Sequence, residues 1–184
     1  MRILSISTGS ITPLFGIDHP DHPVVRSAIK KEIVSSIENP HPVTVGVTGL
    51  AGDEQADFSV HGGLEKAVYA YPAQHYDFWR DTLGINHPVY SELRHGFVGE
   101  NLTIEGFDED NTWVGDIWTI GDTELQVVKL REPCFKFNAR MKHKGAAKAM
   151  IQSARSGWYL QVNHSGVIRA GDSIAVTPGR RETN

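Results

Sequence analysis

The cysteine at position 134 is the residue of this sequence best suited to carry chemistry. Cys134 is the one cysteine of the chain, and it lies between two cations, Arg131 and Lys136. Nearby positive charge stabilises a thiolate, which is the form of cysteine that acts as a nucleophile or binds a soft metal. A cysteine can instead be an inert, buried residue that packs like a small hydrophobe. The charged surroundings favour the functional interpretation.

A pair of glycines with polar neighbours marks a second candidate site. His61-Gly62-Gly63 is followed by Lys66 and an apolar run. Two glycines allow a ligand to approach the backbone closely, or allow a turn with positive φ. His61 and Lys66 could then donate hydrogen bonds to an anion, although a Gly-Gly turn between solvated neighbours explains the segment better on its own. Asn101 precedes another strand-like segment and could bond a polar ring or, equally well, its own backbone.

The charges around Cys134 are unevenly distributed. Residues 95–128 contain no lysine or arginine, whereas residues 129–148 contain seven basic residues and a single acid, Glu132. A basic stripe in a chain of net charge −4 predicts an anionic ligand of limited size. A solvated surface is the alternative interpretation of such a run. The position of Cys134 inside the stripe favours the ligand.

Short strands are the elements that must position these residues. Strand-like patterns occur near 43–47, 67–71, 102–104, 117–120, 125–128, 158–162, 167–169 and 173–176. Gly121-Asp122 predicts a tight hairpin between two of them. Helices are predicted from Pro72 to Gly84 and over residues 146–155, with Gly157 as the terminator of the second. About eight short strands joined by Gly-Asp turns predict a β-barrel or sandwich.

Length and composition predict one ordinary globular domain. The chain has 184 residues, of which 40% are hydrophobic and 22% are charged. A single cysteine cannot form an intrachain disulfide, which favours a reducing compartment. The apolar run after Arg2 is too short for a secretion signal, and no stretch approaches the roughly 20 apolar residues that span a bilayer. We therefore expect a cytoplasmic protein without a membrane or nucleic-acid partner.

Several ordered motifs resemble the MOSC family, named for the C-terminal domain of molybdenum cofactor sulfurase. They are Gly52-Asp53, Gln55-Ala56-Asp57, His61-Gly62-Gly63, the run from Lys66 to Tyr71, Gly99-Glu100-Asn101-Leu102, Gly115-Asp116 and Arg131-Glu132-Pro133-Cys134-Phe135-Lys136. The resemblance covers about residues 27–177 and is nearest to stand-alone bacterial MOSC proteins that reduce N-hydroxylated compounds. Lys129-Leu130 stands where the family commonly has Gln-Pro. We expect a single MOSC domain over residues 1–184, without the C-terminal three-helix extension that such proteins often carry.

The resemblance implies a mainly β fold, a closed β-barrel of the MOSC type with a few short helices. It also implies a molybdenum cofactor (molybdopterin), with Cys134 as the metal ligand and catalytic residue. The expected cofactor-binding residues are Arg131, Lys136, His61, Gly62, Gly63, Lys66 and Asn101. The implied reaction is the reduction of hydroxylaminopurines, hydroxylamines or amidoximes to amines. A separate electron-donating reductase is implied too, because one cysteine cannot hold an iron–sulfur cluster and no glycine-rich nucleotide motif follows a strand.

Two other functions of Cys134 remain open at this point. A persulfide on Cys134 would make the protein a sulfur-transfer enzyme, and a non-enzymatic carrier would bind the pterin and pass it on. The pairs His19 with His22 and His61 with His75 lack a strong zinc-ligand pattern. The expected ligand is a small-molecule substrate, and the expected state is a monomer or a homodimer.

Overall fold

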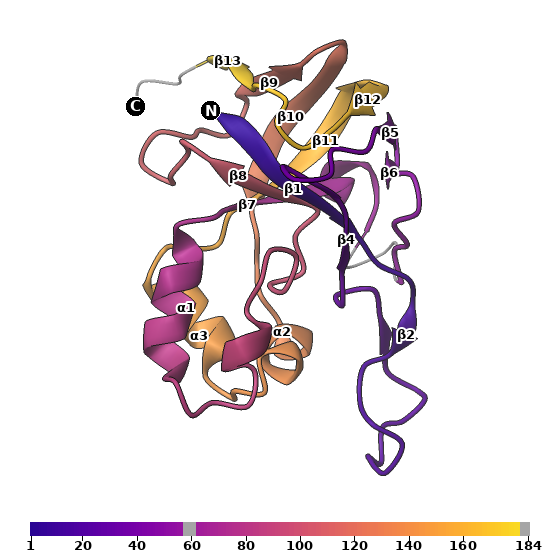
Figure 1. The fold of residues 1–184 in the computed structure, drawn as a ribbon, viewed down its shortest axis with the longest axis vertical. Coiled ribbons are helices and arrows are strands. Elements are labelled where there is room, and N and C mark those ends of the chain that lie inside the picture. Colours follow the sequence, from indigo (N-terminus) through magenta and orange to yellow (C-terminus); the bar gives the residue numbers. More distant parts are fainter. Residues whose placement is uncertain (57–61, 181–184) are drawn as a thin grey trace.

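The computed structural model describes residues 1–56 and 62–180, and most of its regular structure is β-strand (Figure 1). The strands are β1 (Arg2–Thr8), β2 (Thr12–Pro13), β3 (Arg26–Ser27), β4 (Glu32–Ser36), β5 (Val43–Gly46), β6 (Gly49–Leu50), β7 (Val68–Pro72), β8 (Leu102–Glu105), β9 (Ile117–Ile120), β10 (Thr123–Leu130), β11 (Trp158–His164), β12 (Gly166–Ile168) and β13 (Ala175–Thr177). The helices are α1 (His75–Leu83), α2 (Phe135–Arg140) and α3 (Ala146–Gln152), with 3-10 turns η1 (Leu64–Lys66) and η2 (Tyr90–Glu92). In the described part of the chain, no helix is long and apolar enough to cross a membrane.

Eight strands form one strongly curved sheet in the order β13-β9-β10-β11-β7-β8-β1-β4. The prediction of a closed barrel is wrong, because this sheet curls through 209° and remains open. Closure requires the two edge strands to share a ladder. Here β13 pairs with β9 and β4 with β1, while β12, β5 and β6 form a separate three-stranded sheet. The broader prediction of a mainly β fold with few helices is confirmed.

Local sequence signals account for several of the observed elements. The hairpin of β9 and β10 turns at Gly121, which has a φ of 56°. Helix α1 begins shortly after Pro72 and ends at Leu83, because Gly84 takes a φ of 76° that continues no helix. Helix α3 is shorter than predicted and ends at Gln152. The sequence patterns did not predict β1, β4 or α2.

The buried apolar residues form two clusters. One lies within the curve of the sheet and includes Ile6, Trp118 and Trp158. The other lies between the sheet and the helices and includes Trp79 and Phe137. Figure 1 shows α1, α2 and α3 gathered below the sheet, on one side of the molecule. The chain crosses from β10 to α2 at this junction, so residues 131–134 lie between the sheet and the helices.

Candidate functional site

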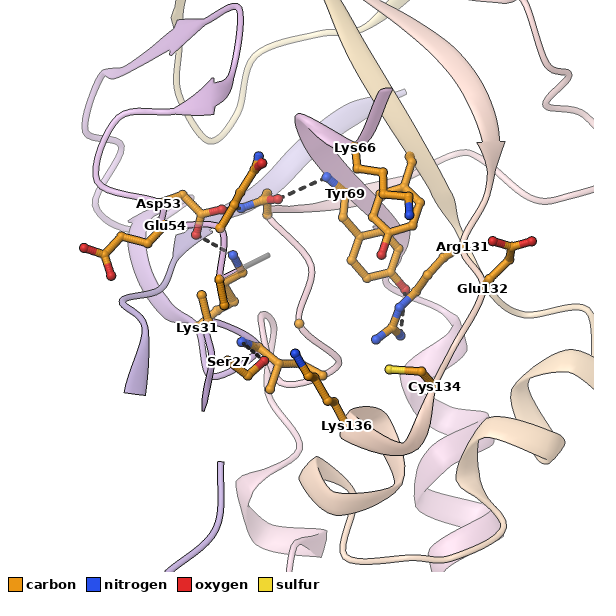
Figure 2. A pocket seen from close by; sticks show the side chains of 17 residues that line it. Ser27, Lys31, Asp53, Glu54, Lys66, Tyr69, Arg131, Glu132, Cys134 and Lys136 are labelled. Atoms are coloured by element: carbon orange, nitrogen blue, oxygen red, sulfur yellow. Dashed lines mark hydrogen bonds and ion pairs between the residues drawn. The ribbon is translucent and has the colours of Figure 1, made fainter. Parts of the chain in front are cut away.

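A cavity of about 110 Å³ opens beside the start of α2 (Figure 2). Its walls come from segments far apart in the sequence: the loops before β4 and β8, the loop after β6, η1, β7, β11, and the segment that joins β10 to α2. Five of the predicted site residues line it together, namely Lys66, Asn101, Arg131, Cys134 and Lys136. The fold thus brings the cysteine motif and part of the glycine-rich motif to one cavity.

Cys134 presents its sulfur to this cavity. The residue has an extended backbone, with a φ of −126°, and it immediately precedes α2. The carbonyl oxygen of Cys134 accepts a 2.9 Å hydrogen bond from the amide of Phe137, which fixes the residue against the first turn of the helix. The side chain is partly buried, and Figure 2 shows its sulfur pointing toward the guanidinium of Arg131. Cys134 is therefore not sealed in an apolar core.

Arg131 is a buried cation that stacks on aromatic rings. The residue is 7% exposed, and its guanidinium carbon lies 4.8 Å from the ring centre of Tyr69 and 4.6 Å from that of Phe137. Its guanidinium donates to neutral atoms, the Tyr69 hydroxyl (3.4 Å) and the Met150 sulfur (3.6 Å). No carboxylate of the described residues lies within ion-pair distance of it. The cavity therefore contains a positive charge that these residues do not neutralise.

Arg131 stays charged although it is buried. Burial by itself opposes the charged form, but the combined influence of Tyr69, Tyr159 and Tyr71 outweighs it, so the pKa of Arg131 is raised above its ordinary value. Burial raises the pKa of Tyr69, so its hydroxyl group stays protonated. This hydroxyl donates a hydrogen bond to the carbonyl of Ser156 at 2.8 Å. A guanidinium remains protonated at any physiological pH. Arg131 is thus a permanent cation beside Cys134.

The other two predicted cations differ from Arg131 in burial. Lys66 and Lys136 are both half-buried. The ammonium of Lys66 lies 5.8 Å from the ring centre of Tyr159, and that of Lys136 donates to the carbonyl of Arg26 at 3.3 Å. These lysines hold positive charge at the cavity wall with more access to water than Arg131 has.

The glycine motif turns the chain toward the cavity. Gly63 has a φ of 92°, which a residue with a Cβ rarely adopts, and its amide donates to Gln55 Oε1 at 2.9 Å. This turn precedes η1 and brings Lys66 to the cavity wall. Gly62 and Gly63 are not among the cavity-lining residues of the described chain, and His61 lies outside the described residues. Contacts of these three residues with a cofactor remain predictions.

Asn101 holds three segments of the wall together. Its Oδ1 accepts from the amide of Tyr69 (3.0 Å), and its Nδ2 donates to the carbonyl of Ser7 (3.2 Å) and to Asp53 Oδ2 (2.9 Å). Asp53 in turn forms an ion pair with Lys31, and both side chains are buried. The amide of Asn101 thus has protein partners at both ends. A bond from it to a ligand remains a prediction.

Glu100 fixes the loop that carries Asn101. This fully buried carboxylate accepts hydrogen bonds on Oε1 from the hydroxyl groups of Tyr76 and Thr103 and from the amide of Gly96. Burial, and then the charge of Glu100, raise the pKa of Tyr76 well above its ordinary value. Because the hydroxyl of Tyr76 stays protonated, it remains a donor to Glu100. The loop therefore presents Asn101 to the cavity in a fixed conformation.

Lys31, Tyr69 and Tyr159 are among the wall residues that were not predicted as site residues from the sequence. Lys31 lies in a charged run of the sequence, which is typical of a solvated surface, yet its side chain is buried in the structure. Tyr69 and Tyr159 read as parts of apolar strands, and their side chains line the cavity. Strand alternation places Tyr159 on the opposite face from the buried Trp158. That alternation is the signal that could have identified Tyr159.

Comparison with known proteins identifies relatives of similar sequence and fold. A family model described as MOSC domain matches residues 57–175. A protein named reductase from Gibberella moniliformis is 38% identical over 83% of this chain and 27% of its own length. The protein YiiM of Escherichia coli is 34% identical over 77% of this chain and 62% of its own length. This chain thus spans less than two thirds of the length of either curated relative.

The fold is also found in a related crystal structure. YiiM from Geobacillus stearothermophilus superposes with a TM-score of 0.71 and 30% sequence identity, over 96% of this chain and 75% of that one. The similarity therefore extends across the sheet, the helices and the segment that carries the cavity.

Proposed function

Because the chain belongs to the MOSC domain family, we propose that it binds a molybdenum cofactor at the cavity and reduces N-hydroxylated compounds there. The observation that carries the proposal is the position of the Cys134 sulfur beside the buried guanidinium of Arg131. Buried charges in proteins are normally paired, and an anionic cofactor would pair with this one. The similarity to a much longer protein named reductase supports an oxidoreductase function.

The donor groups around the cavity fit such a cofactor. Cys134 would supply a thiolate, a soft ligand that must be deprotonated to bind a metal. Arg131, Lys136 and Lys66, in this order, are our candidates for binding the phosphate of the pterin, because arginine offers a planar fork and lysine a point charge. When bound, the cofactor would supply a metal centre that exchanges two electrons with the substrate. The electrons would come from a separate reductase.

Removal of the Arg131 charge is expected to weaken cofactor retention more than removal of either lysine charge. Charge-assisted hydrogen bonds contribute about 1.5–3 kcal/mol, so Arg131→Met should weaken binding by about 10-fold to 100-fold. Lys136→Met and Lys66→Met should have smaller effects, because these side chains are more exposed. Molybdenum and pterin that remain after dialysis are measured, with the exposed Lys148→Met as the control. If Arg131→Met retains as much cofactor as the parent, the proposed order of the phosphate ligands is wrong.

A reductase assay tests the proposed function. The protein is produced in a host that makes the molybdenum cofactor, and reduced methyl viologen serves as the electron donor. Benzamidoxime serves as the N-hydroxylated probe, and we expect benzamidine to form at a rate proportional to the protein concentration. Cofactor-loaded protein that reduces neither benzamidoxime nor a hydroxylaminopurine would overturn the proposal and favour a cofactor carrier. Cyanide-releasable sulfur on metal-free protein would favour the sulfur-transfer alternative.

A further inference from the structure

Lys31 places a buried ammonium group at the wall of the same cavity. Its side chain is 7% exposed, and the ammonium forms an ion pair with Asp53 (Figure 2). The alkyl stem is confined by two glycines. A Cβ on Gly9 would lie 3.1 Å from the Cδ of Lys31, and one on Gly96 would lie 3.4 Å from its Cβ. Packing therefore fixes the position of the ammonium.

The charges around Lys31 act on it in opposite directions. Burial lowers the pKa of Lys31 below its ordinary value, and the carboxylates of Asp53 and Glu100 offset part of that decrease. Lys31 is therefore a better proton donor than a lysine in water, while it keeps a nearby anion that favours its charged form. Among the described residues, the other charged or ionisable groups at the cavity, tyrosines aside, are Glu54, Lys66, Arg131, Glu132, Cys134 and Lys136.

The remaining donors of the described wall are less suited to transfer a proton. Arg131 cannot lose its proton in a protein. Tyr69 donates its hydroxyl hydrogen to the carbonyl of Ser156, and burial raises the pKa of that hydroxyl. Lys66 and Lys136 are half-buried, so water reaches both of them. Packing and an ion pair with the buried carboxylate of Asp53 hold Lys31 in place.

We propose that Lys31 donates the proton that converts the departing hydroxyl group of an N-hydroxylated substrate into water. This inference rests on the proposed function. The net reaction is R–NHOH + 2 e⁻ + 2 H⁺ → R–NH2 + H2O. The N–O bond breaks, a separate redox protein supplies both electrons, and Lys31 protonates the oxygen. A second proton from solvent forms the new N–H bond, and Lys31 regains its proton through the open cavity.

Asp53 is suited to support Lys31 in both protonation states. Its Oδ1 also accepts from the amide of Gly9 at 2.7 Å, and its Oδ2 accepts from Asn101 Nδ2 at 2.9 Å. These neutral donors keep the carboxylate hydrogen-bonded after Lys31 has lost its proton. Asp53 is therefore a positioning residue, which sets the orientation and the proton affinity of Lys31.

Replacement of Lys31 by arginine tests the donor role. Arginine keeps the positive charge next to Asp53 but cannot release a proton. General acid catalysis contributes about 10²-fold to 10⁴-fold, so Lys31→Arg should lower kcat by at least about 100-fold and leave molybdenum content unchanged. The neighbouring Lys30→Arg, at an exposed position outside the cavity, is the matched control and should keep the parent rate. If the parent is active and Lys31→Arg is equally active, the inference about Lys31 is overturned, but the proposed function is not.

A second variant keeps the inference testable if Lys31→Arg does not fold. The pKa of Lys31 is measured by NMR of its ¹⁵N-labelled ammonium, and kcat is measured against pH in the same holoenzyme. A proton donor must be protonated, so kcat should fall as pH rises through the pKa of Lys31. Asp53→Asn removes a favourable charge and should move both values to lower pH, by about one unit or more. If Asp53→Asn shifts the NMR pKa of Lys31 but not the pH dependence of kcat, the inference is overturned. If the parent protein is inactive, both the inference and the proposed function are overturned.

Discussion

Cys134→Ser is expected to lower N-hydroxyl reduction by about 1,000-fold or more, which corresponds to about 4 kcal/mol in the activation barrier. Serine keeps the size of the side chain but replaces a soft sulfur by a hard oxygen with poor affinity for a sulfur-bound metal. The fold should be unaffected, because Cys134 lies at a cavity and not in either apolar cluster. The rate of amine formation and the thermal melting curve measure the two effects.

Cys134→Ala separates the chemistry of the thiol from its size. Alanine also removes the ligand, so it should be as inactive as serine while the free energy of unfolding changes by less than about 1 kcal/mol. Substantial reductase activity in either folded variant would show that Cys134 is not the metal ligand. Inactivity caused by unfolding would instead appear as a melting temperature well below that of the parent.

Lys31→Met is expected to destabilise the protein by about 3 kcal/mol. Removal of one partner of a buried ion pair leaves the other charge uncompensated, at a typical cost of about 3–5 kcal/mol. The lower end applies here, because Asp53 keeps its hydrogen bonds from Gly9 and Asn101. Urea unfolding measures the change. Lys30→Met, at an exposed position, should change stability by less than about 0.5 kcal/mol. A loss below about 1 kcal/mol in Lys31→Met would mean that the ion pair is solvated in solution.

The parts of the fold that follow from neighbouring residues could be predicted from the sequence. Gly121 produces the β9–β10 hairpin, and Gly84 ends α1. Sequence patterns could not show whether the barrel closes, because closure depends on pairing between strands at opposite ends of the sheet order. Strand β1 escaped prediction because Ser5 and Ser7 are buried within it and interrupt its apolar pattern.

In the candidate site, too, contacts between residues close in the sequence were predictable, and contacts between distant residues were not. Arg131 and Cys134 are three positions apart, so their proximity was evident from the sequence. The pair of Lys31 and Asp53 depends on tertiary structure, because β4, β5 and β6 separate the two residues. Lys31 sits in the run Lys30-Lys31-Glu32, whose composition predicts an exposed surface. In the folded chain, Lys31 packs against Gly9 and Gly96, pairs with Asp53 and is buried.

The metal content of the protein shows whether Cys134 binds molybdenum. Parent protein and Cys134→Ser are purified from the same cofactor-competent host, and molybdenum is measured per chain, followed by X-ray absorption at the molybdenum edge. We expect stoichiometric molybdenum with a protein sulfur ligand in the parent, and loss of that ligand, and of most of the metal, in the variant. A Cys134→Ser protein that keeps both the metal and the full set of sulfur ligands would contradict this expectation.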